Sequence, residues 1–160
     1  MPTRNAPIRP ATVLDTAAVA AVHLQAWRET FGDRVPEEVY TDRAVRWPGE
    51  WEATLADPDG PATWLAERDG EAVGVAQAVA TGAGKIRSLE LKYLFVLAAE
   101  HGRRTGTHLL ELAVGDAPCL LWVVEDSEEA IGFYRQHGFE LDGARRPAVD
   151  GHLTEVRMLR

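Results

Sequence analysis

Residues 88–114 read SLELKYLFVLAAEHGRRTGTHLLELAV, and this stretch decides the fold assignment. Apolar side chains alternate over residues 89–95, which predicts a strand with one apolar face. Beyond Gly106 the apolar spacing changes to the helical period, so a helix is expected there. The residues expected on the buried face of that helix are Leu109, Leu112 and Ala113.

The segment between this strand and this helix is HGRRTGTH, residues 101–108, with two glycines, two arginines and two threonines. A helix N-terminus presents unpaired N–H groups and a partial positive charge. The turn therefore suits an anionic ligand, and we expect the phosphates of a coenzyme to bind here.

The whole chain has 160 residues, which suits a single domain over residues 1–160. Its hydrophobic fraction of 46% is ordinary for a globular protein, and its net charge of −8 argues against a nucleic-acid partner. No apolar run is long enough to span a membrane and no signal-peptide core begins the chain, so we expect a cytoplasmic protein without a membrane partner. The single Cys119 cannot form an internal disulfide, and no residue cluster indicates a metal site.

The N-terminal third is expected to be helical after one short strand. Residues 8–12 predict an edge strand, because Pro10 would remove a ladder bond from a central one. Asp15 is the expected N-cap of a helix that runs to about Phe31 and stops at Gly32.

A second helical region is expected from Pro36 to Asp57, with an interruption near Pro48. Trp47 and Trp51 are four residues apart and would share a face if the break were mild. They either pack against the sheet or form a lid on the substrate side.

The middle of the chain predicts a hairpin over residues 63–80. A turn cluster, DPDGP at residues 57–61, precedes it, and Asp69-Gly70 forms the favoured two-residue turn. Residues 81–84 are expected to form a mobile loop that leads into the 89–95 strand.

Residues 119–124, CLLWVV, are almost wholly apolar and predict a parallel strand buried on both faces. The 89–95 strand, the helix and this strand make a βαβ unit. Asp126 and Glu129 indicate a capping box that opens a further helix, which Gly138 ends.

A last hairpin is expected from residues 139–143 and 153–159, with a loop around Pro147 and Asp150-Gly151. The predicted order is β-α-α-β-β-β-α-β-α-β-β. The expected fold class is therefore α/β, or α+β, with a mixed sheet and helices on both faces.

Three segments together resemble the GNAT superfamily of acetyl-CoA-dependent N-acetyltransferases. They are ELKYLFVLAAEHGRRTGTHLL, LLWVVEDSEEAIGFYRQHGFELDG and TEVRMLR. The first matches the central strand and acyl-CoA loop of that family, commonly Arg/Gln-x-x-Gly-x-Gly/Ala. His101 replaces the usual Arg or Gln, Arg104 replaces the middle Gly, Gly106 matches, and Ser127 stands where Asn is frequent.

The resemblance implies a mostly antiparallel sheet with one splayed parallel pair that holds acetyl-CoA as cosubstrate, without a metal. The pantetheine arm would bond main-chain groups of the 89–95 strand and the residues that follow it. The pyrophosphate would lie on N–H groups of residues 102–107. The coenzyme contacts implied in this way are Phe95, Val96, Leu97, Gly102, Arg103, Arg104, Thr105, Gly106, Thr107 and Ser127.

Two residues match positions with catalytic roles in the family. Tyr134 corresponds to a frequent general acid that assists the leaving thiolate; otherwise it is a core aromatic. Glu90 stands where several members carry a basic glutamate; otherwise it is a solvated charge or pairs with Lys92. Strand alternation predicts that Glu90 shares a face with Leu94 and Val96, away from Tyr93.

The acceptor is a weaker inference. Trp27 and Phe31 share a helix side and either wall a substrate pocket or belong to the core. His23 is expected to be a hydrogen-bonded core histidine, with a substrate ligand as the alternative. The acidic balance favours a small cationic amine, with a peptide acceptor as the alternative. A binding domain without efficient turnover is a further alternative, because the HGRRTG loop is irregular. The family resemblance also allows a homodimer.

Overall fold

The computed structural model describes residues 5–160, and its elements follow the predicted order throughout. The chain forms an α/β fold with one mixed sheet. Its strands and main helices are β1 (Ile8–Pro10), α1 (Thr16–Phe31), α2 (Glu37–Ala56), β2 (Thr63–Arg68), β3 (Glu71–Ala80), β4 (Leu89–Val96), α3 (Thr105–Val114), β5 (Leu120–Val124), α4 (Glu128–Gln136), β6 (Glu140–Ala148) and β7 (Leu153–Leu159).

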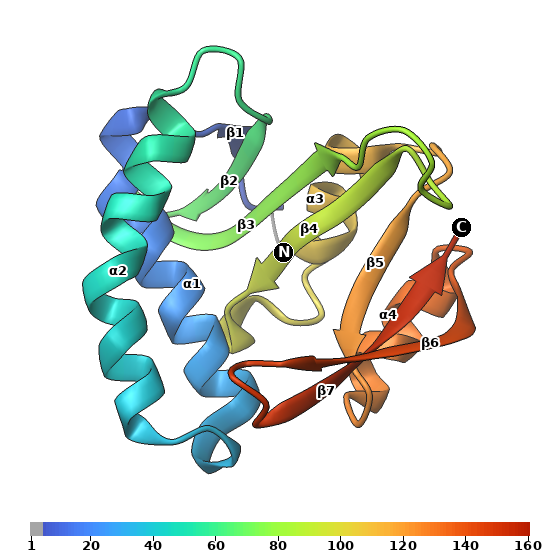
Figure 1. The fold of residues 1–160 in the computed structure, drawn as a ribbon. Coiled ribbons are helices and arrows are strands. Elements are labelled where there is room, and N and C mark those ends of the chain that lie inside the picture. Colours follow the sequence, from blue (N-terminus) through green and yellow to red (C-terminus); the bar gives the residue numbers. More distant parts are fainter. Residues whose placement is uncertain (1–4) are drawn as a thin grey trace.

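The seven strands lie in the order β1-β2-β3-β4-β5-β7-β6, and only β4 and β5 run parallel. Helices α1 and α2 cover one face of the sheet over β2–β4, and α3 and α4 lie against the other face (Figure 1). The predicted class, a mostly antiparallel sheet with one parallel pair and helices on both faces, is confirmed.

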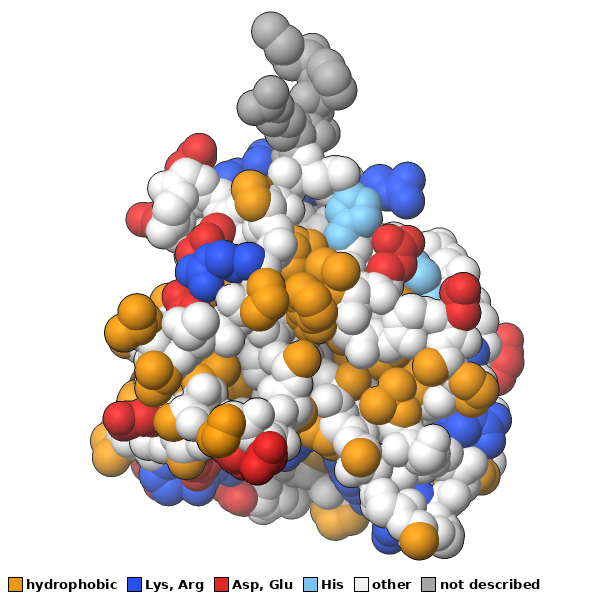
Figure 2. Space-filling view, turned by 90° about the horizontal axis from the view of Figure 1, so that it is seen from above, with side chains coloured by type: hydrophobic (Ala, Val, Ile, Leu, Met, Phe, Trp, Pro, Cys, Tyr) orange, Lys and Arg blue, Asp and Glu red, His pale blue; other side chains and the backbone are white. Residues whose placement is uncertain are grey.

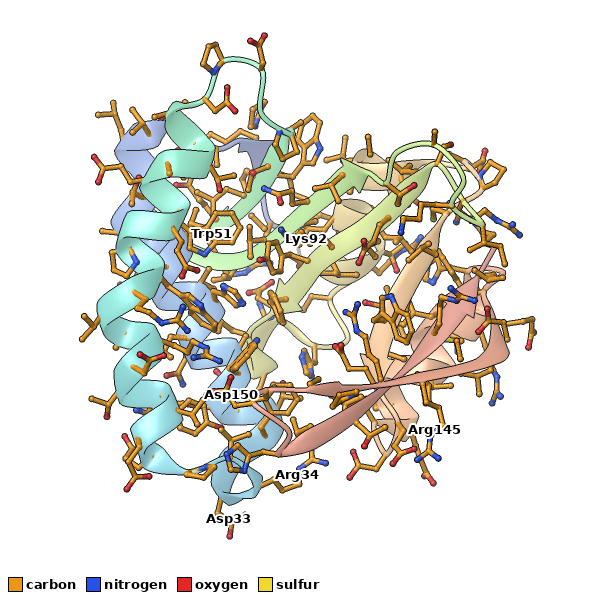
Figure 3. The ribbon with its side chains drawn as sticks, viewed as in Figure 1. Asp33, Arg34, Trp51, Lys92, Arg145 and Asp150 are labelled. Carbon is orange, nitrogen blue, oxygen red and sulfur yellow. The ribbon has the colours of Figure 1, made fainter. Side chains whose placement is uncertain are left out.

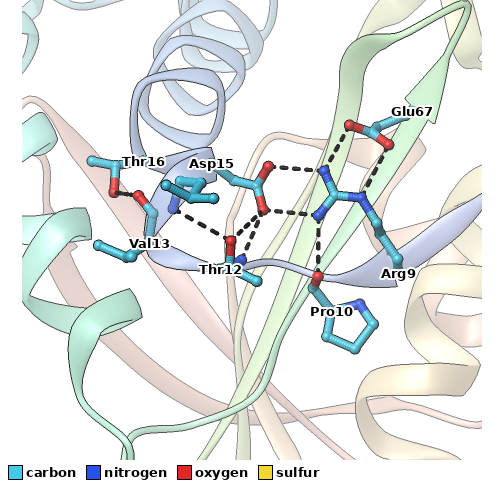
Figure 4. Close-up of polar contacts among 8 residues, drawn as sticks. Arg9, Pro10, Thr12, Val13, Asp15, Thr16 and Glu67 are labelled. Carbon is cyan, nitrogen blue, oxygen red and sulfur yellow. Dashed lines mark hydrogen bonds and ion pairs between the residues drawn. The ribbon is translucent and has the colours of Figure 1, made fainter.

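The first strand is an edge strand, as Pro10 predicted, and an ion-pair network anchors it. The Arg9 guanidinium donates to Asp15 at 2.8 Å and to Glu67 at 2.9 Å (Figure 4). Asp15 is the N-cap of α1 by position, but its carboxylate accepts from Arg9 and from the Thr12 N–H rather than from the helix. The Arg9 hydrogen bonds lower the pKa of Asp15 to about 2.

The predicted interruption of α2 at Pro48 is wrong, because the helix continues through this residue to Ala56. A mid-helix proline removes one hydrogen bond and crowds the preceding turn. On either side of it, Trp47 and Trp51 are buried in the core between α1 and the sheet. Figure 3 shows Trp51 on the side of α2 that faces the sheet. Packing of these rings offsets the free-energy cost of the hydrogen bond that Pro48 removes. Their burial confirms that the two tryptophans are core residues.

The predicted hairpin of β2 and β3 is confirmed, with Asp69 and Gly70 at φ 53° and 81°. Both values suit the two-residue turn that matches strand twist. The predicted buried face of α3 needs one correction. Leu112 is 45% exposed, whereas Leu109, Leu110 and Val114 are buried against the sheet.

The predicted capping box of α4 does not form. Asp126 instead pairs with Arg34, which follows α1, and Ser127 is the N-cap by position without a side-chain capping bond among the described residues. The end of α4 is as predicted. Gly138 has φ +87°, and Phe139 is fully buried behind it.

The last hairpin is longer than predicted, since β6 starts at Glu140 and continues through Pro147 to Ala148. This proline is tolerated because β6 is an edge strand, where a missing N–H does not break a ladder on both sides. The hairpin tip reaches α2, where Asp150 pairs with Arg43 at 3.1 Å. Figure 3 shows Asp150 at this tip, close to the two N-terminal helices.

Candidate active site

The parallel strands β4 and β5 pair at a single register position, Glu90 with Leu120. Each strand continues beyond that point with its other edge paired, β4 to β3 and β5 to β7. The two strands therefore diverge toward their C-terminal ends and leave a splay between them. Main-chain groups that face the splay lack a strand partner, so an extended ligand with amides can pair with them.

A β-bulge in β4 lies next to this splay. Gln77 pairs with Tyr93 and Ala78 pairs with Leu91, which leaves Lys92 as an extra residue. One inserted residue reverses the alternation of side chains along a strand. Odd-numbered side chains before Lys92 therefore point to one face of the sheet, and odd-numbered side chains after it point to the other. Leu91 packs toward α3 and α4, whereas Tyr93 packs toward α1 and α2.

The bulge overturns the predicted orientation of Glu90. Strand alternation placed Glu90 on the face of Leu94, but Leu94 packs toward α3 and α4 together with Leu91. Glu90 therefore lies on the opposite face, with Tyr93. Its charge contributes to a raised pKa of the Tyr93 phenol, although burial is the largest cause and Glu50 the second.

Main-chain groups at the end of β4 divide between the two sides of the strand. The Leu97 N–H donates to the Val73 carbonyl at 2.9 Å, which directs Leu97 toward β3. Hydrogen-bonded and non-bonded pairs alternate in an antiparallel ladder. The main-chain N–H and C=O groups of Phe95 therefore also point toward β3, and those of Val96 point away from it. Of the three predicted pantetheine contacts, Val96 is thus the residue whose main chain is directed into the splay.

The loop after β4 leads to an open helix N-terminus. The first helical bond of α3 runs from the His108 N–H to the Arg104 carbonyl at 3.0 Å. The preceding N–H groups, on Thr105, Gly106 and Thr107, have no partner within the helix, and no side chain caps it among the described residues. These groups can hold an anion. Arg103 and Arg104 flank them on the same loop.

Arg104 occupies the position at which the family pattern has glycine. Its φ is +63° and its ψ 8°, a left-handed conformation that glycine adopts without strain. The preceding Gly102 has φ +78°. The arginine therefore stands in a backbone conformation that disfavours a side chain.

Glu100 is buried and anchors this loop through side-chain hydrogen bonds to Arg68 and Thr105, a role that the sequence did not reveal. Its side chain is 3% exposed, and Oε2 accepts from Arg68 Nη2 at 2.9 Å and from the Thr105 hydroxyl at 3.0 Å. The Arg68 hydrogen bond is the largest cause of a lowered pKa for Glu100. The Thr105 side chain consequently points inward, and this residue could contact a phosphate only through its N–H.

Tyr134 lies on α4, on the face of the sheet opposite Glu90. Its ring makes edge contacts with Phe133 and Phe139 at 5.3 and 5.8 Å between ring centres. Loss of solvent around the phenol raises its pKa, and none of the hydrogen bonds of the described residues involves its hydroxyl. Phe133 also lies close to the first turn of α3, since a Cβ on Gly106 would be 3.6 Å from its ring.

The face beneath α1 and α2 holds an aromatic cluster around the buried His23. The Trp51 indole N–H donates to His23 Nδ1 at 3.1 Å, and Trp47 stacks on the imidazole at 3.7 Å. Burial lowers the pKa of His23 to about 3, so it is a neutral core residue. The expectation of a fully hydrogen-bonded core histidine is met only at Nδ1, because Nε2 is buried without a hydrogen-bond partner among the described residues. Trp27 and Phe31 lie at the end of this cluster, 5.3 Å apart; Phe31 is buried, whereas Trp27 is partly exposed.

The remaining expectations concern Ser127, metals and membranes. Ser127 is partly buried at the start of α4, and capping does not occupy its hydroxyl in the described part of the chain. Within residues 5–160, no group of three or more His, Cys, Asp and Glu side chains is arranged to hold a metal ion. No described helix is both long and apolar enough to cross a membrane.

Comparison with known proteins gives consistent results. A family model for the acetyltransferase (GNAT) domain matches residues 59–141. The chain is 26% identical over 144 residues to the probable N-acetyltransferase Rv2775 of Mycobacterium tuberculosis, which covers 87% of this chain and 82% of that protein.

Two solved structures share the fold along nearly their whole length. The ribosomal-protein-alanine N-acetyltransferase of Brucella melitensis is 25% identical, with a TM-score of 0.72 and coverage of 96% of this chain and 98% of that chain. The PaiA N-acetyltransferase of Thermoplasma acidophilum, in complex with coenzyme A, is 18% identical, with a TM-score of 0.73 and the same coverage.

Proposed function

The chain belongs to the acetyltransferase (GNAT) family, and we propose that it transfers an acetyl group from acetyl-CoA to a primary amine by direct attack within a ternary complex. The observation that carries this proposal is the splay between β4 and β5, which opens beside the uncapped N-terminus of α3. One site offers main-chain partners for an amide-bearing arm, and the other offers N–H groups for a pyrophosphate.

In this proposal the coenzyme extends from the α3 N-terminus into the splay. Val96 supplies main-chain partners to the pantetheine arm, while Gly102, Gly106 and Thr107 lie along the pyrophosphate path. Arg103 and Arg104 add positive charge. The main-chain groups of Phe95 and Leu97 are directed toward β3, so these two residues would shape the site through their side chains and by holding β4 in place. Ser127 would contact the arm from the α4 side.

The two proposed catalytic residues lie on opposite faces of the sheet. Glu90 accepts a proton from the acceptor ammonium, which frees the nitrogen lone pair to attack the thioester carbonyl. A main-chain N–H at the bulge polarises that carbonyl, and the bond to sulfur then breaks. Tyr134 donates its phenolic hydrogen to the leaving sulfur, and the second proton that the attacking nitrogen loses restores the phenol. Its raised pKa keeps it protonated for this role.

A small cationic amine is the proposed acceptor, and two features support it. The Glu90 carboxylate acts on Tyr93 and makes no ion pair among the described residues, whereas Glu50 pairs with Arg46 at 2.9 Å. Glu90 therefore offers the acceptor face one negative charge close to the bulge, although the Lys92 ammonium also lies 5.4 Å from the Tyr93 ring. The β6–β7 tip closes one end of this face, because Val149 and Leu153 pack on the cluster that contains Phe31. A closed end leaves less room for a long peptide than an open groove would. Trp27 is the proposed aromatic wall.

A peptide or protein N-terminus is the second candidate acceptor. The observation that favours it is the similarity to a ribosomal-protein-alanine N-acetyltransferase at 25% identity. A domain that binds the coenzyme without efficient turnover is the third alternative. Its support is the pair of departures from the family motif, His101 and Arg104.

The test is release of free thiol from acetyl-CoA in the presence of a panel of amines, polyamines, antibiotics and short peptides with free N-termini. Acetylation of small cationic amines supports the first candidate, and activity confined to peptides supports the second. Calorimetric binding of acetyl-CoA without thiol release across the panel would favour the binding domain and contradict the enzymatic proposal.

A further inference from the structure

The His101 ring lies between the end of β4 and helix α4. Its Nε2 atom is 3.2 Å from the Val96 carbonyl oxygen, and its Nδ1 atom is 3.7 Å from a Glu129 carboxylate oxygen. Val96 is the residue whose main chain is directed into the splay, and Glu129 belongs to the helix that follows β5. The ring therefore reaches from one wall of the splay to the helix behind the other wall.

The partners of His101 matter because one of them is the proposed coenzyme contact. A pantetheine amide that pairs with β4 would donate to the Val96 carbonyl, which already accepts from the imidazole. The His101 and Glu129 side chains are 53% and 89% exposed, so both can turn into solvent without disturbing the core. The contact can thus be exchanged for a ligand contact.

We propose that His101 is a latch, a side chain that closes the mouth of the splay and that the pantetheine arm of the coenzyme must displace. This inference rests on the proposed coenzyme site and adds a residue that weakens binding where the family motif has Arg or Gln. Because the closed arrangement lowers the fraction of binding-competent molecules, it raises the apparent Kd in proportion.

Hydrogen-bond chemistry assigns separate roles to the two contacts. A carbonyl only accepts, so Nε2 carries the hydrogen that points to Val96. Nδ1 is 3.7 Å from the Glu129 carboxylate oxygen, which is beyond hydrogen-bond distance, so the Val96 contact is the main one and Glu129 supports the ring more weakly. The other charged groups near this loop are Arg103 and Arg104 on the loop itself, Glu29 at the Ala98 N–H, and Glu100, which is directed inward to Arg68.

The experiment is calorimetric titration of coenzyme A into the full chain and three variants. His101→Ala removes the latch, Glu129→Ala removes one of its two supports, and His152→Ala is the matched control at the exposed β6–β7 tip. The coenzyme would no longer have to break the hydrogen bond between His101 and the Val96 carbonyl, so His101→Ala should bind coenzyme A about 2- to 10-fold more tightly. Glu129→Ala should shift the affinity in the same direction by less, and His152→Ala should bind as the original chain does.

The contrary outcomes are distinct. Unchanged or weaker binding by both His101→Ala and Glu129→Ala would overturn the latch while leaving the coenzyme site intact. If neither the original chain nor any variant bound coenzyme A, the proposed function would fail together with the latch. Glu129→Ala keeps the test valid if His101→Ala disturbs the loop, because Glu129 is largely exposed on α4.

Discussion

Glu90 and Tyr93 lie on the same face of β4 although they are three positions apart, because the bulge at Lys92 reverses the alternation between them. In a regular strand the two side chains would point to opposite faces. The bulge thus turns the proposed base toward α1 and α2, while the proposed acid Tyr134 stays behind the sheet with α3 and α4. Coenzyme and acceptor can then approach the splay from different sides.

Glu90→Gln should lower kcat/KM by about 10- to 100-fold near neutral pH, because the amide cannot accept the ammonium proton. The deficit should shrink at alkaline pH, where more of the acceptor is already deprotonated. The measurement is the pH profile of thiol release for both proteins, with Glu52→Gln on the exposed side of α2 as control. Superimposable profiles would exclude Glu90 as the base.

Tyr134→Phe should reduce turnover by about 10- to 100-fold with little change in acetyl-CoA affinity. The phenol has an ordinary pKa near 10, and the raised value keeps it protonated above that pH. The original chain should therefore show no loss of activity from this group between pH 8 and about 10. Turnover of Tyr134→Phe equal to that of the unaltered protein would return the tyrosine to the role of a core aromatic.

Gly106→Val should weaken acetyl-CoA binding, because branched methyl groups would crowd the path of the coenzyme backbone contacts. Gly106→Ala separates this effect from folding, since its Cβ would meet Phe133 and Val96 at 3.6 and 3.8 Å, ordinary contact distances. Gly49→Ala in α2, with open space around the new Cβ, is the control in the same calorimetric titration. Normal affinity in Gly106→Val would place the coenzyme elsewhere.

Arg104→Gly should raise the free energy of unfolding by about 1 kcal/mol, because glycine adopts φ +63° without the strain of a side chain. Urea denaturation measures this gain. Acetyl-CoA affinity should fall at the same time if the guanidinium faces the coenzyme phosphates. A stability loss would show that Arg104 makes contacts worth more than the strain, and an affinity gain would show that its side chain obstructs the ligand.

His23 should make the fold sensitive to acid. Burial lowers its pKa from 6.5 to about 3, so the unfolded chain binds this proton more readily than the native one. The free energy of unfolding should therefore fall as pH drops from about 6.5 toward 3, by at most about 1.4 kcal/mol per pH unit.

Urea denaturation over this pH range measures the effect of His23. His23→Asn keeps an acceptor close to the Trp51 indole and should be less stable at neutral pH but have a flatter dependence on acid. An unchanged slope in that variant would assign the acid sensitivity to other groups.

Local patterns predicted most of the fold. The Asp69-Gly70 turn, the apolar residues 120–124 and the Gly138 helix end each specify their structure through nearby residues, and the structure confirms them. The predictions were wrong where contacts between residues far apart in the sequence determine the local structure. Packing of Trp47 and Trp51 carries α2 through Pro48, and Arg34 draws Asp126 away from the predicted capping box.

The site shows the same division. The loop of residues 101–106 and the helix that follows could be placed from the motif. The orientation of Glu90 could not, because a bulge depends on the register between β3 and β4. Glu100 was missed because its partner Arg68 lies 32 residues away on β2. The net charge of −8 did not locate the acceptor site, since acidic and basic side chains are interspersed on the face shown in Figure 2.

A crystal structure of the chain with coenzyme A tests the central claim most directly, because the account places the coenzyme between β4 and β5. The prediction is a pantetheine amide within hydrogen-bond distance of the Val96 main chain and a pyrophosphate at the N–H groups of Gly106 and Thr107. His101 should have left the Val96 carbonyl. A coenzyme bound away from the splay, with β4 and the α3 N-terminus free of contacts to it, would contradict the account.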